Sequence, residues 1–256
     1  MTKVIAIANQ KGGVGKTTTA VNLASYVAEA GKSVLLVDLD PQGNATSGVG
    51  VDHNQVERSV YDVLIDEVTV QDAVQSTAVK NLYLLPSHIQ LAGAEIELVS
   101  ALAREHILDR ALDTVKPLYE YIFIDCPPSL GLLTLNALTA SDSILVPIQC
   151  EYYALEGLTQ LMNTVRLVKK RLNPSLEIEG IVMTMFNGRT KLAVQVVEEV
   201  KKYFGKKVYS TIIPRNVRLG EAPSYGQPIN IYDKHSAGAL AYRSLAEEFI
   251  RANGGF

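Results

Sequence analysis

Residues 4–18 read VIAIANQKGGVGKTT, an apolar stretch followed by a glycine-rich turn and the start of a helical pattern. Glycines allow successive backbone N–H groups to converge on phosphate oxygens, and the N-terminus of the following helix adds its positive end. The strict pattern G-x-x-x-x-G-K-[ST] is not met, because Gln10 stands where it requires glycine. Residues 11–18 fit a deviant Walker A form that carries an additional lysine at its start. We therefore expect this segment to bind ATP, through Lys11, Gly12, Gly13, Val14, Gly15, Lys16, Thr17 and Thr18.

Two side chains of this loop have the chemistry for phosphoryl transfer. Lys16 would neutralise the β- and γ-phosphates, and Thr17 would hold Mg²⁺ through its hydroxyl. Lys11 precedes the glycines and cannot easily fold back onto the nucleotide that its own loop surrounds. It could reach a second nucleotide across a symmetric interface, as an arginine finger does in trans. The simpler alternative is a solvated surface lysine.

Carboxylates follow two further apolar stretches. Asp38 and Asp40 come after residues 34–37, and Asp125 comes after residues 121–124, as in a Walker B segment. Side chains alternate along a strand, so Asp38 and Asp40 should point to the same side, towards the crevice at the carboxyl ends of the strands. We expect Asp125 to hold Mg²⁺ directly or through water, with Asp38 as a further metal-site residue, and Asp40 to orient the attacking water.

Short β-branched stretches alternate with longer helical patterns along the whole chain. Strands are predicted at residues 4–8, 33–37, 82–85, 121–124, 143–148, 178–185 and 208–213. Helices are predicted at residues 17–30, 95–115, 132–140, 154–171, 192–204 and 237–252. This alternation favours an α/β fold: a doubly wound, mostly parallel sheet with helices on both faces, of the P-loop NTPase type. We predict one domain over residues 1–256.

Composition narrows the class of protein. The 256 residues are 47% hydrophobic and 20% charged with a net charge of −3, which excludes a disordered tail and a globally basic nucleic-acid binder. Charge is uneven, however: residues 166–218 hold twelve basic and four acidic side chains. Cys126 and Cys150 form no disulfide pattern, and no apolar run reaches the length of a membrane span. These features favour a cytoplasmic protein. The uneven charge indicates either solvated helix faces, which explain most charge runs, or a basic surface on an otherwise acidic body.

Four segments together resemble the ParA family of chromosome- and plasmid-partition ATPases, and most of all its short chromosomal branch, Soj. They are KGGVGKTTTAVNLA at 11–24, LLVDLDPQGNATSGVG at 35–50, DCPPS at 125–129 and IIPRNVRLGEAPS at 212–224. Nothing precedes the first strand, so the resemblance is to the type without an N-terminal helix-turn-helix. It implies a homodimer that sandwiches ATP, binds double-stranded DNA nonspecifically and hydrolyses ATP weakly. It also implies stimulation by a basic peptide of a ParB-type partner, a role in DNA segregation and a location on the nucleoid.

The resemblance also assigns residues. It implies that Lys11 contacts the ATP of the other subunit and that Gly12 lies where the two loops meet, so that any side chain there blocks dimerisation. It places Asp40 in the first switch and Asp125 in the second. The remaining assignments are an adenine pocket at Pro214 and Asn216 with Asn187 close to the base, and DNA contacts from Arg189 and Arg218.

Other functions share parts of this pattern. A MinD-like membrane-cycling ATPase has the same loop and aspartates, but it needs a basic amphipathic C-terminal helix, whereas residues 240–256 look like a packed final helix with two glutamates. An iron–sulfur protein of the nitrogenase-iron-protein type needs bridging cysteines that the spacing of Cys126 and Cys150 does not match; Cys126 is better explained as a small apolar core residue. A small-molecule kinase or amide ligase would need an acceptor pocket. A DNA-binding module without hydrolysis would leave Asp40 unexplained.

Overall fold

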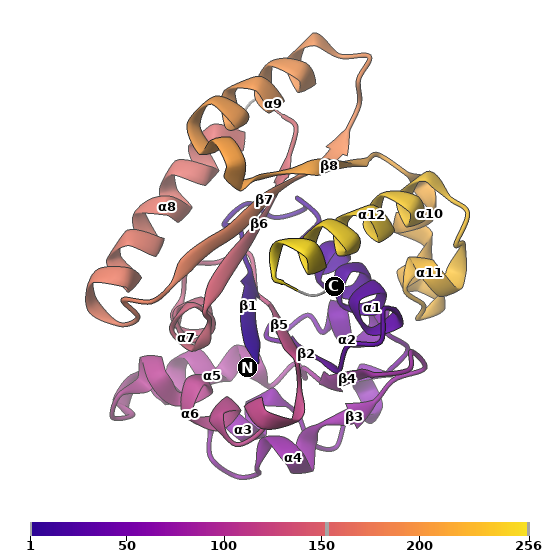
Figure 1. The fold of residues 1–256 in the computed structure, drawn as a ribbon. Coiled ribbons are helices and arrows are strands. Elements are labelled where there is room, and N and C mark those ends of the chain that lie inside the picture. Colours follow the sequence, from indigo (N-terminus) through magenta and orange to yellow (C-terminus); the bar gives the residue numbers. More distant parts are fainter. Residues whose placement is uncertain (1, 152–153, 255–256) are drawn as a thin grey trace.

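In the computed structural model, which describes residues 2–151 and 154–254, eight strands form one sheet in the order β3-β4-β2-β5-β1-β6-β7-β8 (Figure 1). Neighbouring strands are parallel except β3, which pairs antiparallel with β4. The strands are β1 (Lys3–Ile7), β2 (Val34–Asp38), β3 (Gln75–Ser76), β4 (Leu82–Leu85), β5 (Tyr121–Asp125), β6 (Ser143–Gln149), β7 (Glu177–Phe186) and β8 (Val208–Pro214). The predicted doubly wound α/β sheet is confirmed.

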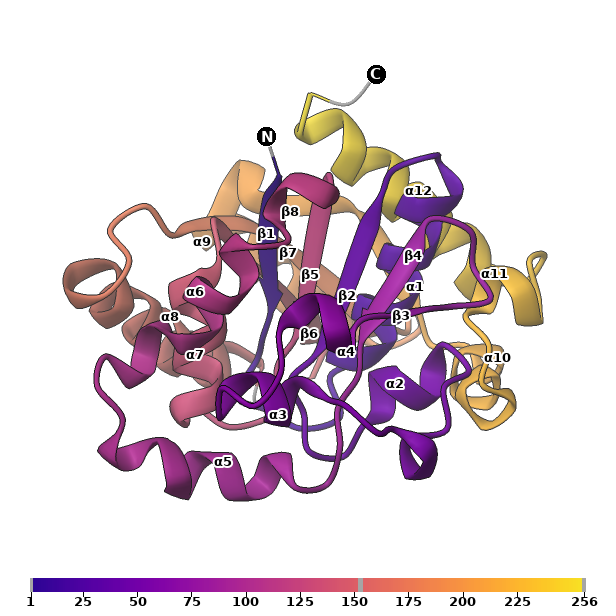
Figure 2. The same ribbon diagram turned by 90° about the horizontal axis from the view of Figure 1, so that it is seen from below.

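Helices cover both faces of the sheet (Figures 1 and 2). One face packs against α1 (Lys16–Glu29), α2 (Asn44–Gly48), α10 (Val217–Glu221), α11 (Ile229–Tyr232) and α12 (Ala237–Ala252). The other packs against α3 (Val60–Leu64), α4 (Val70–Ala73), α5 (Leu91–Glu97), α6 (Ile107–Asp113), α7 (Leu132–Ala140), α8 (Ala154–Arg171) and α9 (Lys191–Phe204). Strand β5 shows why two cores form: Phe123 packs on the first face and Ile124 on the second, because successive side chains point to opposite sides.

The central strands bring three chain segments to one edge. Strand β1 lies between β5 and β6, and Ile7 is in register with Asp125, which in turn is in register with Asp38 of β2. The glycine-rich loop therefore leaves β1 beside the two carboxylates. This is the topological switch point, where ligands bind in open parallel sheets.

The single helix predicted at residues 95–115 is wrong. The chain forms α5, two 3₁₀ turns, η2 (Leu98–Ser100) and η3 (Arg104–His106), and then α6. Ala103 has φ +49°, which a continuous helix cannot contain. The buried side chain of Asn136 stabilises the break by donating to the Arg104 carbonyl at 2.8 Å and accepting from the Leu108 N–H at 3.1 Å. An apolar periodicity does not reveal this interaction, because Asn136 is distant in sequence.

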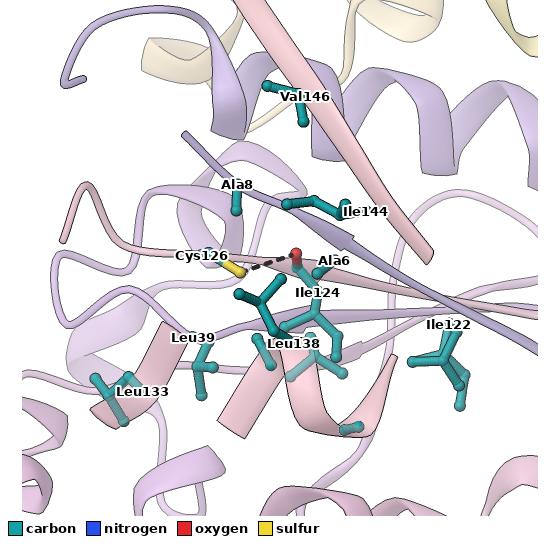
Figure 3. Packing of buried hydrophobic residues seen from close by; sticks show 14 of the residues in the cluster. Ala6, Ala8, Leu39, Ile122, Ile124, Cys126, Leu133, Leu138, Ile144 and Val146 are labelled. Carbon is teal, nitrogen blue, oxygen red and sulfur yellow. Dashed lines mark hydrogen bonds between the residues drawn. The ribbon is translucent and has the colours of Figure 1, made fainter. Parts of the chain in front are cut away.

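Two predictions concern buried side chains: Cys126 as a small apolar core residue, and the C-terminal helix as a packed final helix. Cys126 lies among Ala8, Leu39, Ile124 and other apolar side chains, and its thiol contacts the Ile124 carbonyl (Figure 3). Burial raises the pKa of the Cys126 thiol, as befits a packed apolar residue. Leu245, Phe249 and Ile250 of α12 are likewise buried in the core. Among the described residues, none of the helices combines the length and the apolarity that crossing a membrane requires.

Candidate functional site

The glycine-rich loop between β1 and α1 has the backbone of a phosphate cradle. Gly13 and Gly15 have φ +72° and +87°, in the left-handed region that side chains disfavour. Gly15 is the N-cap of α1, so the unpaired N–H groups of the first helical turn face the loop. Thr184 of β7 donates its hydroxyl to the Val14 carbonyl at 2.8 Å and fixes the loop against the sheet. The arrangement can bind an anion at the helix N-terminus.

The two lysines of the loop have different surroundings. Lys16 is buried and donates to the Lys11 carbonyl at 3.2 Å. Burial lowers the pKa of Lys16, and the nearby carboxylates of Asp125 and Asp40 oppose this shift. The Lys11 ammonium lies outside the cradle, 3.2 Å from Glu151 beyond the end of β6. A single loop thus carries one cation inside and one at its outer side.

Asn9 positions the outer lysine. Its buried amide donates to the Pro147 carbonyl at 2.8 Å, and its side-chain oxygen accepts from the Lys11 N–H at 3.0 Å. Neither this residue nor Glu151 was predicted from the sequence. Asn9 follows the first apolar stretch and precedes the loop, so its place in the chain was a usable signal. Glu151 lacked one, because only the parallel pairing of β1 with β6 brings it near.

Asp125 has the surroundings of a cation ligand. It is fully buried, and neither of its carboxylate oxygens has a hydrogen-bond partner among the described residues. Burial raises the pKa of Asp125 well above its usual range and the Asp38 charge adds to the effect, whereas Thr17 and Lys16 oppose it. A buried carboxylate with free oxygens is costly unless a cation or donor compensates it. Asp125 and the Thr17 hydroxyl are oxygen donors of the kind that Mg²⁺ prefers, so these residues fit the ion.

Asp38 and Asp40 are both buried, but they make different contacts. Asp38 accepts from the Thr46 N–H at 2.7 Å, the Thr46 hydroxyl at 2.8 Å and the Asp40 N–H at 3.2 Å. Burial raises the pKa of Asp38 to about 6, against the effect of these hydrogen bonds. Asp38 thus anchors α2 through Oδ2 and the Asp40 segment through Oδ1, and the use of both oxygens weakens its case as a metal ligand.

The Asp40 segment is held by its backbone rather than by its carboxylate. The Asp40 carbonyl accepts from the Ser87 hydroxyl at 2.7 Å, and Oδ1 accepts from the Gln42 N–H at 3.0 Å. Within the described chain, Oδ1 is the Asp40 carboxylate oxygen for which a hydrogen bond is recorded, so Oδ2 remains available to a water molecule. Ser87 and Thr46 also bond to each other, at 3.0 Å. The sequence patterns did not predict either residue.

A cavity of about 350 Å³ adjoins the phosphate loop. Its lining includes Gly15 and Thr18 of the loop region, Thr184 of β7, and the predicted adenine-pocket residues Pro214 and Asn216. Asn187 does not line this cavity. Asn187 lies just beyond β7 and accepts from the Arg189 N–H at 3.1 Å. The structure therefore brings Pro214 and Asn216 to the loop, whereas the assignment of Asn187 stays a prediction.

Gly12 occupies an open position at the front of the loop. A Cβ added there would meet Pro128 Cβ at 4.0 Å and no closer atom, and Gly12 has no positive φ. Nothing within the described part of the chain therefore requires glycine at this position. A requirement for glycine here would have to come from another molecule.

The two arginines assigned to DNA differ in their ion pairs. Both are exposed. Arg218 lies 2.8 Å from Glu221 and 3.5 Å from Asp233, whereas the described residues provide no ion pair for Arg189. The basic segment spans the end of α8, β7, α9, β8 and the start of α10. In Figure 1, α8 and α9 lie side by side, whereas α10 lies beyond the end of β8, with the helices that cover the other face of the sheet.

Sequence comparison agrees with this site. A family model described as an AAA domain matches residues 2–178. The sporulation initiation inhibitor protein Soj of Bacillus subtilis is 64% identical over 254 residues, which cover 99% of this chain and 100% of that protein. The chromosome-partitioning ATPase Soj of Treponema pallidum is 52% identical, with 99% of each chain covered. The chain belongs to the Soj/ParA family of chromosome-partitioning ATPases. The predicted ATPase class is thereby confirmed.

Solved structures that are similar to this fold contain bound nucleotide and magnesium. A cobyrinic acid a,c-diamide synthase of Mycobacterium smegmatis with bound ADP and magnesium is 39% identical, with a TM-score of 0.87, and covers 99% of this chain and 96% of its own. The septum site-determining protein MinD of Pyrococcus horikoshii, complexed with Mg-ADP, is 29% identical with a TM-score of 0.81, covering 99% and 98%. Both are similar over the whole Soj/ParA domain. The shared fold alone does not separate partition from amide ligation or division-site placement.

Proposed function

We propose that this chain is an ATP-operated switch of DNA segregation. ATP builds a homodimer, the dimer binds double-stranded DNA nonspecifically, and hydrolysis, stimulated by a basic peptide of a ParB-type partner, dissolves it. Such a cycle would place the protein in the cytoplasm, on the nucleoid. The observation that carries the proposal is the position of Lys11, outside the phosphate cradle that Lys16 occupies.

ATP would bind with its phosphates in the loop at residues 11–18 and its base in the cavity beside Pro214 and Asn216. Lys16 would exchange the Lys11 carbonyl for phosphate oxygens. Asp125 and Thr17 would hold Mg²⁺, which neutralises charge on the β- and γ-phosphates. Asp40 would orient the attacking water with its free oxygen. Phosphoryl transfer depends mainly on positioning and charge compensation, so this aspartate needs no raised basicity.

Dimerisation would use the outer side of the loop. The Lys11–Glu151 pair is partly exposed, with side-chain exposures of 33% and 49%, and exposed pairs contribute about 0.2–1 kcal/mol. Lys11 can therefore leave Glu151 at low cost for the triphosphate of a second subunit. Gly12 has open space in front of it, which suits a close approach of two loops.

DNA binding would follow from dimerisation by adding charges. One subunit offers the exposed cations of its basic segment, and a pair doubles that number. Nonspecific affinity rises steeply with the phosphates neutralised, since each contributes about −0.9 to the slope of log K against log salt. Hydrolysis would therefore release DNA by separating the subunits.

The alternative is a MinD-like membrane-cycling ATPase. Membrane binding through α12 would require its apolar face to be free, but Leu245, Phe249 and Ile250 are each at most 1% exposed. Packing of these side chains on α1 and β8 favours the DNA-binding role.

The test is to follow mass and DNA binding together. Light scattering should give twice 27.9 kDa with ATP and Mg²⁺ and the single mass with ADP, and only the dimer should shift a duplex of arbitrary sequence. Asp40→Ala should reduce hydrolysis by about 100-fold or more and trap the dimer on DNA, because an unpositioned water attacks slowly. Wild-type mass and DNA retention that are both unaffected by ATP would contradict the proposal, and binding to anionic vesicles in place of DNA would favour the alternative.

A further inference from the structure

A hollow of about 1000 Å³ is lined by residues of α3, α4, α5 and α6 and of the segments beside them, and it shares no lining residue with the cavity at the phosphate loop. We name it the α3–α6 hollow. Its apolar lining includes Val63, Leu98, Leu102, Ile107 and Ala111, and its polar lining includes four carboxylates and two arginines. The ATPase cycle described above uses none of these residues.

The hollow is acidic. Asp66, Glu67, Asp72 and Glu97 line it against Arg58 and Arg110. Within the described residues, Asp66 and Glu67 take part in no ion pair. The surrounding residues 57–114 hold ten acidic and four basic side chains, the reverse of the basic segment 166–218. Such a surface repels nucleic acid and anionic lipid and attracts cations.

Apolar side chains also stand exposed at this end of the molecule. Leu102 in the lining is 92% exposed, and Ile96 and Val99 on the same stretch are 78% and 59% exposed. Three large apolar residues exposed within seven positions exceed the scattered single residues of an ordinary surface. Free carboxylates beside exposed leucine and isoleucine match a partner that presents both positive and apolar groups.

We propose that the α3–α6 hollow docks a basic amphipathic segment of a partner protein. Lysine or arginine side chains of that segment pair with Asp66 and Glu67, and its apolar side chains cover Leu102. Charge complementarity selects this occupant over a symmetric contact between two copies of the chain, because such a contact would bring the same acidic surfaces together.

Two sets of contacts connect the hollow to the nucleotide site. The N-terminus of α3 donates from Val60 N–H to the Pro86 carbonyl at 2.8 Å, and the next residue, Ser87, holds the Asp40 carbonyl at 2.7 Å. On α5, Glu95 accepts from the Leu133 N–H at the start of α7, at 3.3 Å. A segment bound to α3 and α5 therefore acts on the loop that carries Asp40 and on the helix that follows Asp125. This effect on hydrolysis rests on the proposed function, whereas docking itself does not.

The test uses a fluorescein-labelled 18-residue peptide with lysine and leucine on opposite faces of a helix, titrated into the full chain by anisotropy. Asp66→Asn/Glu67→Gln should weaken binding about five-fold, since two exposed ion pairs are lost. Asparagine tolerates the φ of +65° at position 66. Glu198→Gln/Glu247→Gln removes the same charge from exposed sites on α9 and α12 and should leave affinity unchanged. Leu102→Ser should weaken binding, and Leu240→Ser on α12 should not.

Equal effects of the hollow variants and their matched controls, with melting temperatures unchanged, would overturn the inference. So would a changed molar mass of the Asp66→Asn/Glu67→Gln variant with ATP, because the hollow would then be a contact between copies. ATP turnover is measured on the same samples. If the chain has no ATP turnover but its peptide binding is weakened by the hollow variants, docking is supported and the proposed function is contradicted. If turnover is normal but the hollow variants bind the peptide as wild type does, the proposed function is supported and docking is contradicted.

Discussion

The charged side chains of the nucleotide site and those of the basic segment have opposite surroundings. At the carboxyl ends of β1, β2 and β5, Lys16, Asp38 and Asp125 are buried and held within one connected set of contacts. Across α8, α9 and β8, Arg189 and most of its basic neighbours are exposed, and the cations are spread over more than fifty residues of sequence. The first region depends on geometry, so one lost atom should abolish its function. The second depends on summed charge, so its losses should be graded.

The sharpest test of the geometric region is Lys16→Ala. It removes the buried cation that would meet the phosphates, and we expect ATP affinity to fall by about 100-fold or more, the range for a lost charge-assisted contact in a closed site. Isothermal titration with ATP and Mg²⁺ measures it. ATP affinity equal to that of wild type would show that the nucleotide site does not depend on this one buried cation.

Gly12→Val separates the loop's internal geometry from its contact with a second subunit. A Cβ at position 12 would meet no closer atom than Pro128 Cβ at 4.0 Å, so we expect the Gly12→Val chain to fold and bind ATP normally, yet remain a monomer by light scattering. Gly13→Ala is the matched control, because φ +72° makes a side chain there cost about 1–2 kcal/mol of stability. A dimer of Gly12→Val with ATP would show that the loops do not meet.

Within the basic segment, Arg189→Glu and Arg218→Glu should differ. Arg189 has a free charge, so reversal should weaken duplex binding by the ATP-bound dimer about ten-fold and reduce the salt slope by about 2, one contact for each subunit. Arg218 already faces Glu221 and Asp233, so its reversal should cost less. Dimerisation should persist in both. Equal gel-shift affinities of wild type and the Arg189 variant would show that Arg189 in this segment does not contribute to DNA binding.

Asp125→Asn tests the nucleotide site through stability rather than through binding. Because burial raises the pKa of Asp125 in the folded chain, its protonated form is favoured there, and wild-type stability falls as pH rises from the unfolded pKa through the folded one. Without nucleotide, the asparagine variant should be more stable at pH 7 by about 2 kcal/mol, and equal to wild type near pH 4. Urea unfolding at both pH values measures this, and a constant difference between them would mean that the carboxylate is compensated.

Prediction from the sequence succeeded where signals are local. The alternation of apolar stretches and helical patterns predicted the seven longer strands. It failed between residues 95 and 115, where Asn136 interrupts the helix from a distance. Short elements such as β3, α4 and α11 were also missed, since two to four residues carry too little periodicity.

The sequence by itself determined the nucleotide loop, the carboxylates that accompany it and the excess of basic residues, because each depends on residue types at fixed short spacings. Only the tertiary structure decided that Asp38 anchors α2 while Asp125 keeps free oxygens, that Lys11 faces Glu151, and that Arg218 is already paired. These outcomes depend on which strands lie side by side and on what each charge meets there. Burial and pairing of a charge are properties of the neighbours that the fold assembles around it, and those neighbours are distant along the chain.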